Sequence, residues 1–140
     1  MAYRFLDHTA DIAVEIAAGS LGDLFAEALV AFAEVVTEPA RIEERLVRHF
    51  ELAAPGPDLL LVDWLTELLY AFESEGLLFR RAEVDVAAAA GGFRLVADAH
   101  GEPRDDARHP IKVLVKAVTY HGLVIEETAQ GFRARVVFDI

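Results

Sequence analysis

The segment Asp58-Leu-Leu-Leu-Val-Asp-Trp-Leu-Thr-Glu-Leu-Leu-Tyr-Ala-Phe-Glu-Ser-Glu75 decides the fold. Its polar side chains recur at helical spacing and form one narrow stripe, whereas the rest of the circumference is apolar. The segment follows Pro55-Gly56-Pro57 and precedes Gly76, so the pattern predicts a helix that Asp58 caps and Gly76 ends. A helix that is apolar over most of its surface has to lie deep, against a sheet.

A second helix and several strands are predicted around it. The helix covers about residues 20–36, where Ser20 and Asp23 resemble a capping box and apolar residues recur at helical spacing. The predicted strands cover residues 3–8, 11–17, 41–53, 77–87, 93–100 and 132–139. The first two are two short strands or one bent strand, and residues 41–53 also fit a helix, although a strand is preferred. The pattern predicts a single α+β domain over residues 1–140, a two-layer sandwich in which a mostly antiparallel sheet carries both helices on one face.

The composition disfavours several classes of protein. Among 140 residues, 13 Lys and Arg stand against 24 Asp and Glu, a net charge of −11, so no direct binding of nucleic acid is expected. A more basic partner protein remains open. No apolar run is long enough to span a membrane, and the first residues lack the zones of a signal peptide, so a cytoplasmic protein is expected. Cysteine is absent, and the sequence contains no phosphate-binding loop, dinucleotide fingerprint or nucleophile elbow.

The stretch Lys116-Ala-Val-Thr-Tyr-His-Gly-Leu-Val124 fits neither ordinary core nor ordinary surface. A lysine in so apolar a segment costs free energy unless its amine reaches water or a carboxylate. The chain is predicted to be extended from residue 111 to residue 128, with a bulge or break at Gly122. The residues leave open whether 111–118 is a strand or a short helical turn.

Two other stretches supply carboxylates. Asp11 lies at the mouth of the second predicted strand, and Asp139 adjoins Ile140, whose α-carboxylate ends the sequence. An apolar strand that runs to these residues predicts a docked terminus. If the three carboxylates meet, they repel one another unless a cation joins them, and oxygen-only ligands favour Ca²⁺ or Mg²⁺ over zinc. The alternative is that Lys116 offsets the same charge as an ion-pair partner.

Five blocks of sequence resemble the archease family, in the family's order and from one end of the chain to the other. They are His8-Thr-Ala-Asp-Ile12, Ser20-Leu-Gly-Asp-Leu-Phe-Ala-Glu-Ala28, Trp64-Leu-Thr-Glu-Leu-Leu-Tyr70, Lys116-Ala-Val-Thr-Tyr-His121 and Asp139-Ile140. The resemblance implies an accessory protein rather than an enzyme, with no catalytic residues of its own. Archease activates RtcB-type RNA ligases, which act in tRNA splicing and RNA repair, by promoting guanylylation and multiple turnover of the ligase. Family members are also linked to a tRNA methyltransferase, as chaperone-like modulators.

The resemblance also implies a set of site residues. The family's metal site, with calcium as the expected ion, carries over to Asp11, to Asp139 and to Ile140 through its carboxylate. Lys116 matches the family lysine that is needed for activation of the partner.

Two histidines complete the set. His8 and His121 belong to the matching blocks and are assigned, with Lys116, to activation of the partner. A different class of function stays open: a small metal-dependent hydrolase that uses Asp11, Asp139 and a bound cation, with His8 or His121 as the base.

Overall fold

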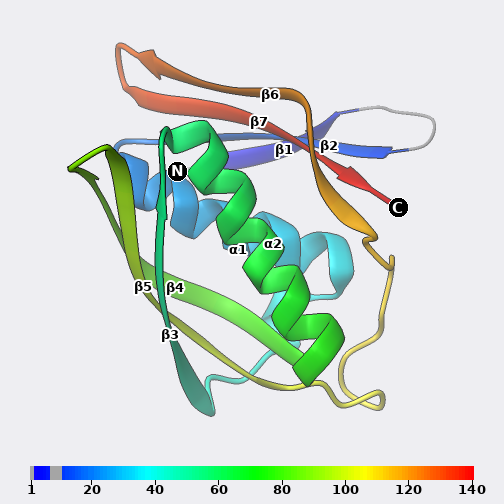
Figure 1. The fold of residues 1–140 in the computed structure, drawn as a ribbon. Coiled ribbons are helices and arrows are strands. Elements are labelled where there is room, and N and C mark those ends of the chain that lie inside the picture. The colour runs from blue at the N-terminus through cyan, green and yellow to red at the C-terminus, as the bar shows by residue number, and fades with distance from the viewer. Residues whose placement is uncertain (1, 7–10) are drawn as a thin grey trace.

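The computed structural model describes residues 2–6 and 11–140, and its described elements confirm the α+β class (Figure 1). Two helices, one short 3-10 turn and seven strands follow one another along these residues. They are β1 (Ala2–Leu6), β2 (Asp11–Ala18), α1 (Leu21–Val36), η1 (Pro39–Arg41), β3 (Leu46–Ala54), α2 (Pro57–Glu75), β4 (Leu77–Ala89), β5 (Gly92–Pro103), β6 (Ala117–Thr128) and β7 (Gly131–Asp139).

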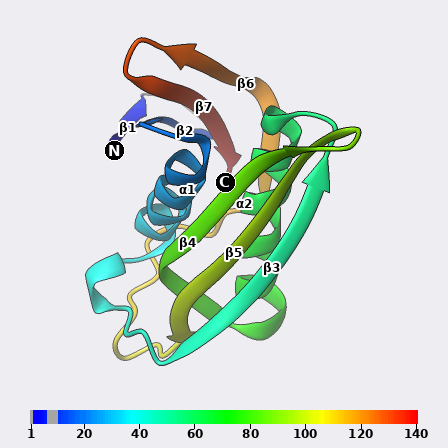
Figure 2. The same cartoon turned by 90° about the vertical axis from the view of Figure 1, so that its left-hand side faces the viewer.

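The described strands divide between two antiparallel sheets, where the sequence predicted one. The first sheet has the order β1-β2-β7-β6 and the second the order β3-β5-β4. Helix α1 packs on β2 and β4, and α2 packs on β6 and β3, so both helices lie between the sheets (Figures 1 and 2). Alternation along a strand shows which residues are buried, but it does not show which strands are neighbours, so the division was not visible in the sequence.

Helix α2 lies at the centre of the core, as its apolar circumference predicted. The side chain of Trp64 is fully buried, and its ring meets the ring of Phe50 edge to face at a centroid distance of 5.3 Å. Its indole Nε1–H donates a hydrogen bond of 2.9 Å to the carbonyl oxygen of Phe25 in α1, so the two helices are joined by a polar contact inside the core. None of the described helices is long and apolar enough to cross a membrane.

The ends of α2 differ in part from the prediction. Gly76 ends the helix in the left-handed conformation, with φ 66°, as expected. The prediction of Asp58 as the N-cap is wrong: Gly56 caps the helix, and Pro57 takes the first helical position. Proline suits that position because a backbone N–H there would have no partner within the helix. The helix therefore begins at Pro57, one residue before Asp58.

Helix α1 begins where the capping box predicted. The Ser20 hydroxyl accepts a hydrogen bond of 3.1 Å from the backbone N–H of Asp23. Gly22 lets the first turn approach β4, because a Cβ at this position would lie 2.4 Å from the carbonyl oxygen of Val84.

The preferred strand after α1 is confirmed in β3, but it begins at Leu46 rather than at residue 41, because residue 41 ends the 3-10 turn and residues 42–45 form neither strand nor helix. Residues 111–116 are neither strand nor helix, and β6 begins at Ala117. The predicted bulge is confirmed at residues 120–123: Thr119 pairs with Val137 and Val124 pairs with Arg135, so the four residues of the bulge face Val136 alone. Gly122 in the bulge has φ 66°, a conformation that glycine adopts readily.

Candidate functional site at the end of β2, β6 and β7

Two aspartates meet where β2 begins and β7 ends. Asp11 and Asp139 are partners in the antiparallel register of these strands, and both are half-buried. Residues directly opposite each other in such a pair point to the same face of the sheet, with Cβ atoms about 5 Å apart. The two carboxylates therefore share one face and repel each other in the absence of a cation.

Lys116 lies next to Asp139 on the β6 side of β7, opposite to the side on which Asp11 lies. Its backbone N–H donates a hydrogen bond of 2.8 Å to the carbonyl oxygen of Asp139, and the next residue, Ala117, is the register partner of Asp139. The side chain of Lys116 is exposed, whereas Val115 and Val118 are buried on either side. The apolar segment therefore does not bury the amine, which reaches water.

The ion-pair alternative for Lys116 is not observed among the described residues. Lys112, the only other lysine of the sequence, has its amine 3.5 Å from the carboxylate of Glu34. The ion pairs of residues 2–6 and 11–140 include no such contact for Lys116. Its charge is thus available to a molecule that approaches the end of the sheet.

The bulge of β6 covers the same face of the sheet as the two carboxylates. Val137 and Asp139 are two residues apart in β7, so their side chains point to the same face of the sheet. The side chain of Val137 is 0% exposed. A Cβ on Gly122 would lie 4.0 Å from a methyl group of Val137, so the bulge lies over this residue. His121 is exposed within the bulge, and its backbone N–H donates to the Thr119 hydroxyl at 3.3 Å. His8 lies outside the described residues.

The donors at this end of the sheet fit a hard cation better than zinc. Asp11 and Asp139 offer carboxylate oxygens, and Ile140 follows directly after Asp139. Within residues 2–6 and 11–140, no group of three or more His, Cys, Asp and Glu side chains is arranged to hold a metal ion. Two carboxylates with main-chain or water oxygens suit Ca²⁺, which accepts oxygen ligands of several kinds in a flexible geometry.

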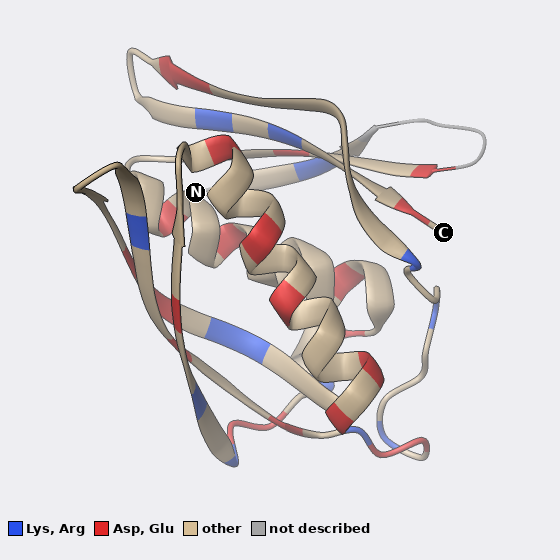
Figure 3. Cartoon of the chain, viewed as in Figure 1, with Lys and Arg blue, Asp and Glu red and all other residues tan. Residues whose placement is uncertain are grey.

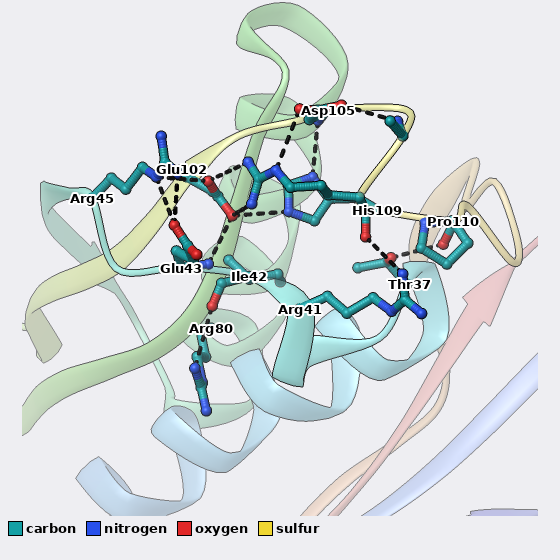
Figure 4. A network of polar contacts seen from close by, with 12 residues as sticks. Thr37, Arg41, Ile42, Glu43, Arg45, Arg80, Glu102, Asp105, His109 and Pro110 are labelled. Carbon is teal, nitrogen blue, oxygen red and sulfur yellow. Dashed lines mark hydrogen bonds and ion pairs between the residues drawn. The ribbon is translucent and has the colours of Figure 1, made fainter.

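A buried polar network, which the sequence did not reveal, lies about Glu102 (Figure 4). The carboxylate is 1% exposed and accepts hydrogen bonds from Arg108 Nη2 at 2.7 Å and Nη1 at 3.0 Å, and from the backbone N–H of Glu43 at 2.7 Å. The ring of His109, 0% exposed, lies 2.9 Å from the same carboxylate through Nε2. These contacts, led by the hydrogen bonds from Arg108, lower the pKa of Glu102 from 4.5 to about 2.

The network escaped prediction because residues 101–110 have the composition of a solvated loop. Charged residues in such a loop are usually exposed, and sequence alone does not show which of them the fold encloses. The available signal was the short separation of Glu102, Arg108 and His109, whose side chains form complementary hydrogen bonds.

Comparisons with known proteins agree along the whole chain. Residues 3–140 match the sequence profile of the Archease protein family (MTH1598/TM1083). The protein archease of Methanosarcina barkeri is 39% identical over 139 residues, which are 99% of this chain and 95% of that protein.

Two solved structures share the fold. The solution structure of Methanobacterium thermoautotrophicum protein 1598 matches with a TM-score of 0.85 and 31% identity, over 99% of this chain and 98% of that one. The crystal structure from Thermotoga maritima, described as an archease and possible chaperone, matches with a TM-score of 0.64 and 21% identity over 96% and 94% of the two chains.

Proposed function

Because the chain belongs to the archease family, we propose that it is an accessory protein that activates an RtcB-type RNA ligase. It promotes guanylylation of the ligase and thereby lets the ligase turn over repeatedly, in tRNA splicing and RNA repair. In this proposal the chain supplies no catalytic residue and has no turnover without its partner.

The single observation that carries the proposal is the meeting of three sequence-distant groups at one end of the first sheet. Asp11 and Asp139 are register partners, and the backbone of Lys116 is hydrogen-bonded to Asp139. Two carboxylates and an exposed amine at one edge make a polar contact surface with a defined shape. Such a surface fits a protein partner better than it fits a reaction, since no buried nucleophile or base lies beside it in the described part of the chain.

A divalent cation, with calcium as the preferred ion, completes the surface in this proposal. Asp11, Asp139 and the carboxylate of Ile140 would hold it. The bound ion supplies positive charge that offsets the repulsion of the carboxylates and gives them one arrangement. The side chains themselves bind and orient, and Lys116 stays exposed to meet a phosphate or a carboxylate of the partner.

The charge of the chain supports a basic protein partner rather than RNA. The net charge is −11, and α2 carries acidic residues and no basic ones (Figure 3). Negative surface repels the phosphates of RNA but speeds and orients association with a basic protein surface. The acidic accessory protein would dock at the entrance to the ligase's nucleotide and metal site. It favours guanylylation by binding more tightly to the ligase conformation in which that reaction proceeds.

Multiple-turnover ligation with the cognate ligase tests the proposal. The ligase is assayed with the wild-type protein and with Asp11→Ala, Asp139→Ala and Lys116→Ala, and each variant is expected to lose activation. Lys112→Ala is the matched control for Lys116, because it removes the other lysine four residues earlier. Asp85→Ala is the control for the aspartates, because Asp85 is exposed on the second sheet. Wild-type activation by all three site variants would refute the site assignment.

Assays of methyl transfer and of phosphoester cleavage, run beside the ligation assay, separate the alternatives. A chaperone-like modulator of a tRNA methyltransferase would raise methyl transfer and leave ligation unchanged. A metal-dependent hydrolase that uses Asp11 and Asp139 would cleave a phosphoester without any partner, with His121 or His8 as the base. Either result, with no effect on the ligase, replaces the proposed function.

A further inference from the structure

Residues 109–116, here called the strap, connect the second sheet to the first. The strap contains no strand or helix, so no regular hydrogen-bond ladder fixes its path. It begins beside β5 at His109 and ends beside β7 at Lys116, whose backbone N–H donates to Asp139. The position of Lys116 therefore depends on how the strap is held along its length.

Hydrogen bonds to α1 and β5 hold the first half of the strap. The Thr37 hydroxyl, at the end of α1, donates to the carbonyl oxygen of Pro110 at 2.7 Å. The backbone N–H of Lys112 donates to the carbonyl oxygen of Val36 at 2.8 Å. These two contacts fix the middle of the strap to α1, and the network about Glu102 fixes its start to β5.

The hydrogen bonds of the network favour one tautomer of the His109 ring. The backbone N–H of Asp105 donates to Nδ1 at 2.9 Å, so Nδ1 is an acceptor and carries no proton. Nε2 then carries the proton and donates a hydrogen bond of 2.9 Å to the carboxylate of Glu102. Both ring nitrogens are hydrogen-bonded and the ring is fully buried, so His109 links Glu102 to the strap.

We propose that Glu102, Arg108 and His109 are positioning residues, which act on the partner only through the strap and Lys116. Arg108 immediately precedes the strap and His109 begins it, and both bind the carboxylate of Glu102. Loss of this anchor leaves the strap with its hydrogen bonds to α1 and β7 and with the packing of Val115 in the core, and its backbone then opens more often. The part that concerns activation rests on the proposed function, whereas the effect on the strap does not.

Amide hydrogen exchange of Glu102→Gln tests the effect on the strap directly. The backbone N–H groups of Lys112 and Lys116 donate to Val36 and Asp139, and their exchange is expected to become about tenfold faster. The amides within α2 are expected to keep their rates, because a local opening leaves the core closed. Asp106→Asn is the control, since it breaks an exposed ion pair with Arg104 in the same loop. Equal rates at Lys112 and Lys116 in wild type and Glu102→Gln would overturn the proposal.

Arg108→Lys keeps the proposal testable if Glu102→Gln does not fold. Lysine keeps the positive charge of Arg108 but cannot make both of its hydrogen bonds to Glu102, so exchange at Lys112 and Lys116 is again expected to rise. Unchanged exchange in this variant would show that the strap does not depend on the network about Glu102 and would overturn the proposal.

Ligase activation then tests whether the anchors act through Lys116. Glu102→Gln is expected to lower maximal activation, whereas the control Asp106→Asn is expected to keep it. Wild-type activation by Glu102→Gln, in a protein whose exchange at Lys116 is faster, would contradict positioning. If the wild-type protein activates no ligase, the proposed function fails, and the exchange result still decides the proposal about the strap.

Discussion

Asp11 lies directly opposite Asp139 in the antiparallel pairing of β2 with β7. The register of these strands is fixed by their inner face, where Val14 pairs with Val136 and both are fully buried. A shift of one residue would turn every buried side chain toward the other face, so the core imposes the meeting of the two acids. The fold therefore includes the repulsion between the two carboxylates, and a cation that binds between them would stabilise the folded protein by relieving it.

Removal of one of these charges is expected to stabilise the metal-free protein and to abolish its response to calcium. Asp11→Asn removes a like-charge pair, which is worth about 0.5 kcal/mol in the free energy of unfolding. Calcium at a hundredfold excess over its Kd would stabilise the wild type by about 2.7 kcal/mol and the variant by much less. Thermal unfolding with a chelator and with calcium measures both effects. A calcium response of equal size in Asp11→Asn would exclude Asp11 as a ligand, and Asp85→Asn serves as the control.

Acid is expected to weaken the protein through Glu102. The pKa of this carboxyl is about 2 in the folded protein, against an ordinary value of 4.5, because Arg108 and the other donors stabilise the charged form. Since the folded pKa is the lower one, the stabilisation is fully present above pH 4.5 and is lost as the pH falls from 4.5 to 2. Urea unfolding across this range is expected to show a steeper loss of stability in the wild type than in Glu102→Gln.

The two proteins also differ at neutral pH. Glu102→Gln is expected to cost about 2 kcal/mol in the free energy of unfolding at pH 7, because charged hydrogen bonds to Arg108 are lost. The difference between the proteins should shrink toward pH 2. A difference that stays constant between pH 2 and 7 would contradict the role of the ionised carboxylate.

The contact of α1 with β4 predicts an unusual effect of alanine in a helix. Alanine usually stabilises a helix by about 1 kcal/mol relative to glycine. At Gly22, however, the added Cβ would lie 2.4 Å from the carbonyl oxygen of Val84, a backbone atom that cannot move alone. Gly22→Ala is therefore expected to destabilise the protein by about 2 kcal/mol. Gly19→Ala is the control, because a Cβ there meets nothing within 4 Å. Urea unfolding would contradict the contact if Gly22→Ala proved the more stable variant.

Local patterns predicted the elements well, and the residues explain why. The apolar circumference of α2 predicted its central burial, and the break at Gly122 predicted the bulge of β6. The division into two sheets was not predictable, because it depends on which strands become neighbours. Residue types alone favour Asp58 as the cap, because the sequence does not show the extended backbone of Gly56.

The site was predictable in part. The sequence singled out Asp11, Asp139 and Lys116, and the fold brings them to one end of the first sheet, although Lys116 is exposed rather than enclosed. The roles of these residues in binding calcium and a partner stay predictions. Glu102 and His109 were missed because the network that encloses them includes the backbone N–H of Glu43, in the loop before β3 and far away in the sequence.

Guanylylation of the ligase, measured directly, tests the proposed function most sharply. Purified ligase is mixed with labelled GTP and calcium, with no protein added, with the wild-type protein, with Lys116→Ala or with Lys112→Ala, and the rate of label transfer to the ligase is recorded. The wild type and Lys112→Ala are expected to accelerate the transfer, and Lys116→Ala is expected to leave it at the rate of the ligase alone. A rate that the wild-type protein does not raise would contradict the proposed function.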